Sequence, residues 1–186
     1  AHHMVADHGS FGVFLVDLAT AYRARRSGAA PEWVPLPITY ADYALWQRDL
    51  LASEFGRAEL EYWRGALAGL PDAIDVAHDR PRPLVLSKDA EVVSFTVPAT
   101  VRNGLKALAE ESGASEFMLC QAAVATALYK LGGGADIAIG TPIAGRVDEH
   151  TADVIGLFAN MVVLRNDVSG NPSLRTVLQR GRDSAL

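Results

Sequence analysis

The sequence predicts a fold that mixes helices with strands, of the α/β or α+β class. Apolar residues recur at helical spacing in several segments, and short segments elsewhere have the pattern of strands. Of the 186 residues, 49% are apolar and 21% are charged, the balance of a soluble globular protein. The length suits one ordinary domain or two small halves.

The first part of the chain is predicted to be mostly helical. Ser10 is expected to cap a helix over residues 10–26. The apolar face of that helix consists of Phe11, Phe14, Leu15, Leu18 and Tyr22. Thr39 is expected to cap a helix that ends near Leu51, and a further helix is predicted over residues 57–68.

The second part is predicted to mix strands with helices. Residues 69–89 contain prolines and charges without a clear period, which predicts a linker. In residues 91–97, Val93, Phe95 and Val97 alternate on one side, the pattern of a half-buried strand. The remaining elements are expected to be helices at 99–111 and 115–131, strands at 136–140 and 160–165, and a helix from Ser173.

Charge, hydropathy and cysteine content argue against several classes of protein. A net charge of −5 makes nucleic acid an unsuitable partner. No apolar run reaches the roughly 18 residues of a membrane-spanning helix, and the N-terminus lacks the pattern of a signal peptide. The single cysteine, Cys120, fits a reducing cytoplasm. Because it lies in an apolar helical stretch, we expect a buried, inert thiol.

Two adjacent histidines and an acid open the chain. His2 and His3 precede Asp7, and an imidazole can take a proton from an amine or hydroxyl that attacks a carbonyl. The helix start after Asp7 offers backbone N–H groups and a positive dipole potential. A tag remnant ahead of Met4 is one alternative, which the acid and the capped helix weaken. A metal site is another, but these residues with His8 do not form a recognised ligand set.

Three further segments carry distinctive residues whose ordinary explanation is structural. They are residues 40–47 (YADYALWQ), 139–146 (IGTPIAGR) and 155–165 (IGLFANMVVLR). In the first segment, Tyr43 and Trp46 at helical spacing indicate core packing. Taken alone, Arg146 would be a surface charge, and Asn160 a turn or hydrogen-bonding residue.

In this order and spacing, the four segments resemble the core motifs of condensation domains of nonribosomal peptide synthetases. Residues 2–7 resemble HHxxxDG, residues 40–47 YxDYAxWQ, residues 139–146 IGTPxAxR, and residues 156–165 GxFxNxxxLR. The connection from YWR at 62–64 to DRPRP at 79–83 is similar as well. The resemblance covers essentially the whole chain. The resemblance departs at His8, where the family usually has glycine. A glycine there can adopt a positive φ and allow the substrate to approach closely, so either His8 adopts an unusual backbone conformation or Gly9 takes over this role.

The resemblance implies a chloramphenicol-acetyltransferase-like fold of two lobes, present here only in part. Residues 1–70 would be the C-terminal part of the N-lobe with the histidine loop, 71–89 a linker, and 90–186 the first part of the C-lobe. Both chain ends are abrupt and the last helix reads as unfinished, which predicts an excerpt of a longer protein. With most of one lobe missing, we expect the isolated chain to be inactive.

The activity that the resemblance implies is peptide-bond formation in nonribosomal peptide biosynthesis, a cytoplasmic process of secondary metabolism that makes antibiotics. A donor acyl or peptidyl thioester would react with an acceptor aminoacyl thioester. No cofactor would be covalently bound, because both substrates would arrive on phosphopantetheine arms of upstream and downstream peptidyl carrier domains. An adenylation domain would belong to the same megasynthase, and neither nucleic acid nor membrane is expected as a partner.

The resemblance also implies roles for the two histidines. His3 is expected to act as general base toward the amine, or to position it. In an extended segment, neighbouring side chains point to opposite sides, so His2 is expected to serve the scaffold.

The other motif residues are expected to support this site. Asp7 would pair with Arg146 and hold the histidine loop. The N–H of His8 or Gly9 would support the oxyanion, and Asn160 would make a polar contact in the channel. Three alternatives stay open: an acyl-CoA-dependent O-acyltransferase, an epimerization-type domain, and a non-catalytic module that only docks carrier domains.

Overall fold

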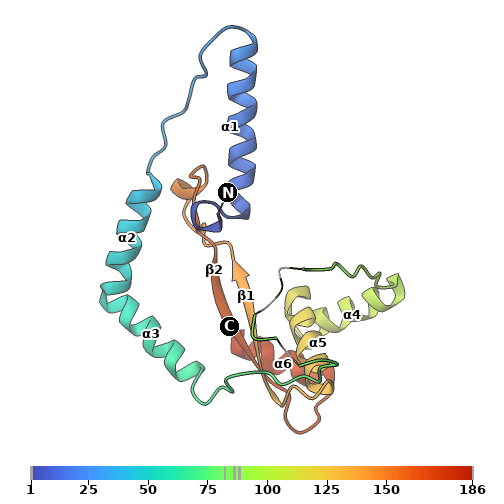
Figure 1. Cartoon of the computed structure of the whole chain (residues 1–186). Helices are drawn as coiled ribbons and strands as arrows, with labels where there is room; N and C mark the ends of the chain where they lie inside the picture. Colours follow the sequence, from blue (N-terminus) through green and yellow to red (C-terminus); the bar gives the residue numbers. More distant parts are fainter. Residues whose placement is uncertain (1, 82, 86, 88, 186) are drawn as a thin grey trace. The chain divides into compact units, whose positions relative to one another are not determined.

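The computed structural model describes residues 2–81, 83–85, 87 and 89–185 (Figure 1). The chain forms two compact units: unit 1 consists of residues 1–68 and 141–162, and unit 2 of residues 69–140 and 163–186. Helices and strands occur together, which confirms the predicted mixed class. In the described part of the chain, no helix is long and apolar enough to cross a membrane.

Unit 1 is mainly helical. Its elements are the 3₁₀ turns η1 (His3–Val5) and η2 (Glu149–Thr151) and the helices α1 (His8–Arg26), α2 (Tyr40–Ala52) and α3 (Glu54–Ala66). Thr39 caps α2 as predicted, and its side chain accepts a hydrogen bond from Asp42 N. Helix α3 begins three residues before its predicted start because the side chain of Ser53 caps it, accepting from Gly56 N.

The start of α1 differs from the prediction. Its N-cap is Asp7, whose side chain accepts from Ser10 N, while the Ser10 side chain returns to the Asp7 backbone. Ser10 is therefore the third helical residue of a capping box, and its predicted role as N-cap is wrong. Both residue types are good caps, so the local sequence alone could not choose between them.

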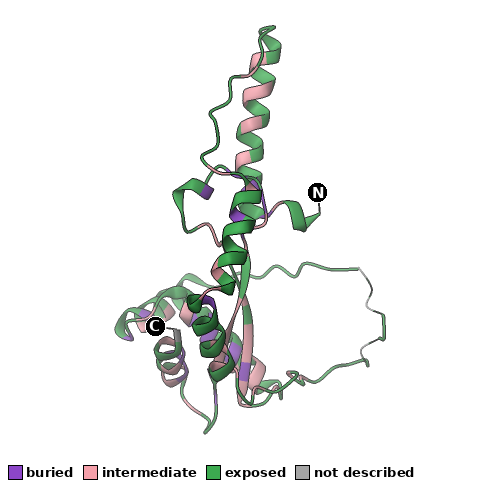
Figure 2. Ribbon diagram, turned by 90° about the vertical axis from the view of Figure 1, so that its left-hand side faces the viewer, coloured by how far each residue is buried: buried purple, intermediate pink, exposed green. Residues whose placement is uncertain are grey.

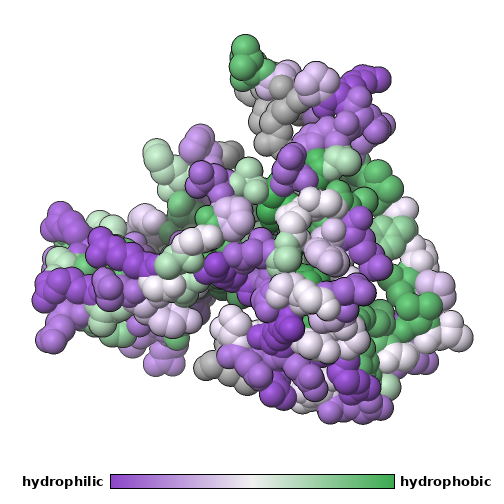
Figure 3. Space-filling model, turned by 90° about the horizontal axis from the view of Figure 1, so that it is seen from below, coloured by the Kyte–Doolittle hydropathy of each residue, from purple (hydrophilic) through white to green (hydrophobic). Residues whose placement is uncertain are grey.

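Much of the apolar surface of unit 1 is exposed. The five residues of the predicted α1 face are between 51% and 63% exposed. Figure 2 accordingly shows α1 largely as exposed or intermediate. Green patches on the face drawn in Figure 3 show that apolar side chains reach the surface elsewhere in the chain as well. Among the described residues, the buried apolar cluster of this unit is limited to Tyr43, Val154 and Phe158.

Unit 2 contains the larger apolar core. Its helices are α4 (Ala99–Glu111), α5 (Glu116–Lys130) and α6 (Leu174–Ala185), close to the predicted bounds. The buried members of its core come from all three helices, from β1 and from the residue that follows β2. They are Ala109, Leu119, Ala122, Ala125, Ile137, Val168, Val177 and Leu178.

The strands β1 (Asp136–Ile143) and β2 (Asn160–Asp167) form a two-stranded sheet whose residues belong to both units. Val168 N donates to Ala135 O, so the end of β2 lies beside the start of β1 and the pair is antiparallel. Both predicted strands are confirmed and are longer than expected. A buried amide pair joins α5 to β2, in which Gln121 Nε2 donates to Asn166 Oδ1 over 2.8 Å.

Two expectations for unit 2 are wrong. Residues 91–97 form no strand, and Val93 and Phe95 are 84% and 85% exposed. A strand needs a neighbour for its backbone hydrogen bonds, and none lies beside this segment among the described residues. Cys120 is exposed rather than buried, because α5 buries the face that carries Leu119 and Ala122 and leaves Cys120 on another.

Candidate active site

The histidine segment presents its two imidazoles differently. His2 precedes η1 in an extended conformation, and its Nδ1 accepts a hydrogen bond of 3.1 Å from Met4 N. Residues 3–5 form a 3₁₀ turn, so the expectation of an extended segment is wrong from His3 onward. The His3 side chain is exposed and makes no hydrogen bond or ion pair with the described residues. The imidazole of His2 is thus engaged by the backbone, and that of His3 is available.

Asp7 ends this segment and is 3% exposed. Its Oδ1 accepts from the backbone and the hydroxyl of Ser10, each at 2.9 Å. Its Oδ2 accepts from Phe158 N at 3.0 Å and from Ala159 N at 3.2 Å. Burial by itself raises the pKa of Asp7, but these hydrogen bonds and the one from Arg146 outweigh burial and hold the pKa well below its ordinary value.

Arg146 is the charged partner of Asp7. Its Nη2 lies 3.2 Å from Asp7 Oδ1, and the side chains are 14% and 3% exposed, which confirms the predicted ion pair. Nη1 donates to Thr151 O at 2.6 Å and to Val154 O at 2.8 Å. The guanidinium also lies 4.1 Å from the centre of the Phe158 ring. Arg146 is therefore a largely buried organising residue, and its interpretation as a surface charge is wrong.

Ser10 links the histidine segment to the segment that follows Ile155. Its side chain is almost fully buried, at 1% exposure for the residue. Its Oγ lies 2.8 Å from Gly156 O, accepts from Gly156 N at 3.1 Å, and accepts from Arg146 Nη2 at 2.9 Å. The sequence analysis missed this role. The Asp-x-x-Ser spacing of a capping box was the signal that could have indicated its partnership with Asp7.

Tyr40 holds the same segment from another side. Its hydroxyl donates to Leu157 O at 2.8 Å, and its ring meets that of Phe158 edge-on with 5.4 Å between centroids. Gly156 lies against the Tyr40 ring with no room for a Cβ atom. Gly145 has φ +68, and a Cβ there would clash with Phe158 O. All four sequence motifs therefore converge on residues 155–159.

The departure at His8 does not strain the backbone. His8 is the first residue of α1, and among the described residues the positive-φ position outside glycine is Asn171. Gly9 is where close packing occurs, because a Cβ atom there would lie 2.9 Å from Arg146 Nε. His8 therefore adopts no unusual conformation, and Gly9, which is helical without a positive φ, allows the close approach of Arg146.

The remaining candidates lie outside this network of hydrogen bonds. Asn160 begins β2 directly after residues 155–159 and is exposed. Its Oδ1 accepts a hydrogen bond of 2.8 Å from Met161 N. His78 is exposed, and the exposed His150 pairs with Asp148 over 2.6 Å. No cluster of three or more potential metal ligands occurs in the described residues.

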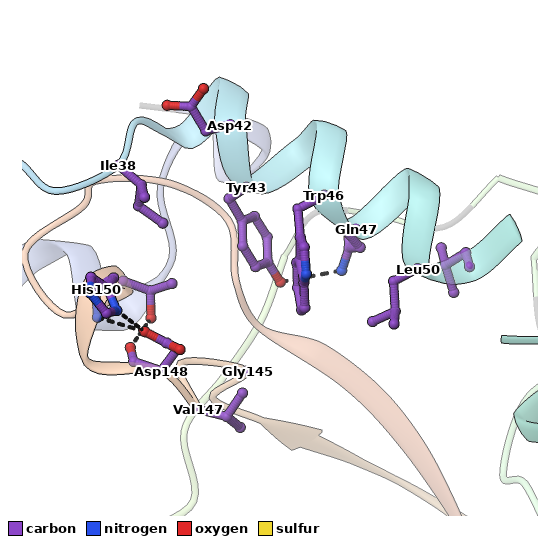
Figure 4. A pocket seen from close by; sticks show the side chains of 12 residues that line it. Ile38, Asp42, Tyr43, Trp46, Gln47, Leu50, Gly145, Val147, Asp148 and His150 are labelled. Carbon is purple, nitrogen blue, oxygen red and sulfur yellow. Dashed lines mark hydrogen bonds and ion pairs between the residues drawn. The ribbon is translucent and has the colours of Figure 1, made fainter. Parts of the chain in front are cut away.

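A cavity of about 420 Å³ lies between α2 and the segment around η2 (Figure 4). Tyr43 is nearly buried beside it, as the core-packing interpretation requires, and Gln47 Nε2 donates to the Tyr43 hydroxyl at 3.2 Å. Burial and the neighbouring Tyr40 raise the pKa of Tyr43. Trp46 is 54% exposed and lines the cavity, so its expected burial in the core is wrong.

Comparisons with known proteins identify the family. The family model named Condensation domain matches residues 1–186. The chain is 49% identical over 191 residues to the "Probable non-canonical nonribosomal peptide synthetase (NRPS) CymA" of Salinispora arenicola, and this match covers 100% of the chain and 2% of that protein. The chain thus belongs to the condensation-domain family.

Solved structures agree. The X-domain from teicoplanin biosynthesis is 35% identical with a TM-score of 0.93, and the match covers 100% of this chain and 42% of that one. It has also been solved in a complex with OxyB. The first condensation domain of the CDA synthetase has a TM-score of 0.71 at 24% identity, covering 100% of this chain and 40% of that one. The predicted chloramphenicol-acetyltransferase-like fold, present in part, is confirmed.

Proposed function

We propose that this chain forms the histidine-bearing part of a condensation domain that makes amide bonds in nonribosomal peptide biosynthesis. Condensation domains are acyltransferase-type enzymes as a class. The observation that supports the proposal is the contrast at the chain start. The His3 imidazole is exposed and makes no hydrogen bond with the described residues. The preceding residue, His2, accepts a hydrogen bond from Met4 N, and Asp7 further along accepts one from Phe158 N.

The chemistry assigned to His3 is proton management. The acceptor amine attacks the donor thioester carbonyl, the new C–N bond forms, the C–S bond breaks, and the amine proton ends on the departing thiol. A neutral imidazole can accept that proton or hold the amine by a hydrogen bond. Asp7 is unsuited to proton transfer because both of its oxygens already accept hydrogen bonds. Its role in this proposal is to hold the loop.

The substrates and partners follow from the family. Both acyl groups would arrive as thioesters on the phosphopantetheine arms of upstream and downstream carrier domains, in a megasynthase that also contains an adenylation domain. The relative from Salinispora, named as a probable nonribosomal peptide synthetase, supports this arrangement. We propose that Asn160 makes a polar contact with these substrates, because it is exposed and directly follows residues 155–159. The division into residues 1–70, 71–89 and 90–186 remains a proposal about the lobes.

The test compares His3→Ala with His2→Ala in a complete condensation domain that carries this sequence. Single-turnover condensation between loaded carrier domains is measured together with thermal melts. We expect His3→Ala to lose about 10²- to 10⁴-fold in rate at an unchanged melting temperature. His2→Ala should act mainly on loop stability, because it removes the acceptor of Met4 N. A stable His3→Ala domain that turns over at the wild-type rate contradicts the proposal.

A second candidate function is a docking module without catalysis. It is favoured by the TM-score of 0.93 with the X-domain, which has been solved in complex with OxyB. In that case carrier or enzyme binding persists, and no condensation product appears with any loaded substrate pair. The same single-turnover assay therefore separates the two candidates.

The 186-residue chain alone is proposed to be inactive. Its α1 face is at least half exposed, and large exposed apolar faces favour aggregation. Product above background from the purified chain would contradict this expectation.

A further inference from the structure

The hydroxyl of Ser10 lies at the centre of a buried network of hydrogen bonds. Its Oγ contacts both polar backbone groups of Gly156, with 2.8 Å to the carbonyl and 3.1 Å to the N–H. It also lies 2.9 Å from Asp7 Oδ1 and 2.9 Å from Arg146 Nη2. Gly156 O in turn accepts from Asp7 N at 3.1 Å. One atom thus connects three segments that are far apart in the sequence.

Every bonding position of this hydroxyl is used. A serine Oγ has two lone pairs and one proton. Three donors share the lone pairs, namely Gly156 N at 3.1 Å, Arg146 Nη2 at 2.9 Å and Asp7 N at 3.4 Å, and the proton serves Gly156 O or Asp7 Oδ1. Water cannot take over these contacts without entering a site where Ser10 is 1% exposed. Removing the hydroxyl would leave the buried N–H of Gly156 without its acceptor. Gly156 O, Asp7 Oδ1 and Arg146 Nη2 would each lose one contact and keep another.

The location of Ser10 connects it to the histidine turn. Asp7, the N-cap with which Ser10 forms the capping box, is four positions after His3, and η1 begins at His3. The His3 side chain is exposed and makes no hydrogen bond or ion pair with the described residues that would fix its place. The position of His3 therefore depends on the backbone that Asp7 holds in place. Ser10 connects Asp7 to Gly156, because its Oγ contacts both the carbonyl and the N–H of Gly156.

We propose that Ser10 is a positioning residue for His3, which ties the histidine turn to residues 155–159 through its buried hydroxyl. The proposal rests on the proposed function, because it needs His3 to act on the substrate. Ser10 itself touches no substrate in this scheme. A displacement of about 1 Å in a catalytic group can cost on the order of 10²-fold in rate, so a loosened turn should reduce kcat.

The experiment uses a complete condensation domain with the variants Ser10→Ala, Ser10→Thr, His3→Ala and the Ser10→Ala/His3→Ala double variant. Ser10→Ala should lose about 10- to 100-fold in kcat with KM changed less than about twofold. Ser10→Thr keeps the hydroxyl and should recover most of that rate. Ser10 lies beside a cavity of about 310 Å³, toward which the added methyl group of threonine would have to point.

The double variant separates positioning from general loss of structure. If Ser10 acts through His3, removing its hydroxyl should change nothing further once the imidazole is gone. An equal loss from Ser10→Ala in both backgrounds would mean a merely structural role and would overturn the proposal. Wild-type turnover by Ser10→Ala would overturn it too. Thermal melts of every variant show whether each remains folded.

Hydrogen exchange at Gly156 supplies a readout that does not depend on activity. Its N–H donates to Ser10 Oγ, so Ser10→Ala should speed its exchange while the amides of the α5 interior keep theirs. Unchanged protection at Gly156 would contradict the proposal. If His3→Ala has no effect on turnover, the proposed function fails. If His3→Ala is impaired as expected and the double variant loses additively, only the Ser10 proposal fails.

Discussion

Two aspartate–arginine pairs, one in each unit, are built in contrasting ways. Asp7 and Arg146 in unit 1 are 3% and 14% exposed, and both make several other hydrogen bonds. Asp136 and Arg165 in unit 2 are 33% and 31% exposed and meet in a two-point contact of 2.9 and 2.7 Å. The hydrogen bond and charge of Asp136 raise the pKa of Arg165.

The difference between the two pairs results from the different interiors of their units. Unit 2 has an apolar core in which Ala125, Ile137 and Leu178 are 0% exposed, so its half-exposed pair is not needed to fill the interior. Each unit buries polar residues, which are Asp7, Ser10 and Thr151 in unit 1 and Ser112, Gln121 and Asn166 in unit 2. Because unit 1 buries fewer apolar side chains, polar groups make up a larger share of its interior. Buried polar groups stabilise only when all are satisfied, which makes unit 1 the part more sensitive to single polar substitutions.

The largest expected effect is that of Asp7→Ala. Removing one partner of a buried pair leaves the other charge without compensation and costs about 3–5 kcal/mol. Asp136→Ala is the matched control, and its loss should be about 1 kcal/mol or less because solvent screens that pair. Chemical denaturation of a complete domain measures both. Equal losses would mean that burial does not distinguish the two pairs.

A smaller effect is expected from Gly9→Ala. The new methyl group would lie 2.9 Å from Arg146 Nε, and Arg146 cannot move freely because Thr151 and Val154 hold its Nη1. Overpacking of this kind costs about 1–3 kcal/mol. Gly12→Ala is the control in the same helix, since nothing lies within 4 Å of its Cβ position. There alanine should stabilise by up to about 1 kcal/mol. If Gly9→Ala and Gly12→Ala both stabilise the domain, Arg146 does not pack tightly against α1.

The smallest expected effect is a change in acid sensitivity. Asp7 has a pKa below its ordinary 3.8 when folded, so the unfolded chain binds its proton first as the pH falls. Its contribution is complete above about pH 5 and declines as the pH falls below the unfolded value toward the folded one.

Asp7→Asn removes this titration, so the free energy of unfolding should fall less steeply below about pH 4 than in the wild type. Asp42→Asn is the control. The hydrogen bonds of Thr39 also lower the pKa of Asp42, but Asp42 is exposed, and its change of slope should be smaller. Denaturation at several pH values between about 2.5 and 6 measures both slopes. Parallel curves for wild type and Asp7→Asn would contradict the assignment.

Local signals predicted most of the secondary structure correctly. Helices α2, α4 and α5 and the two strands were found from periodicity and caps, because the residues that define them lie within a few positions of each other. The wrong strand at residues 91–97 had the right alternation, but its backbone needed a partner that alternation cannot supply. The same limit explains why burial was wrongly predicted for Cys120 and Trp46. Their exposure depends on which face of the helix packs against a neighbouring element.

The sequence by itself predicted the family and the four motifs and, through the family resemblance, the pairing of Asp7 with Arg146 and the proposed role of His3. Only the tertiary structure decided that all four motifs meet at residues 155–159, that Arg146 is buried, and that Ser10 belongs to the site. The physical reason is distance along the chain. The bond from Phe158 N to Asp7 joins residues 151 positions apart, and the contact of Ser10 with Gly156 spans 146. No local pattern encodes such contacts, because they exist only when the chain has folded and each buried polar group must find its partner.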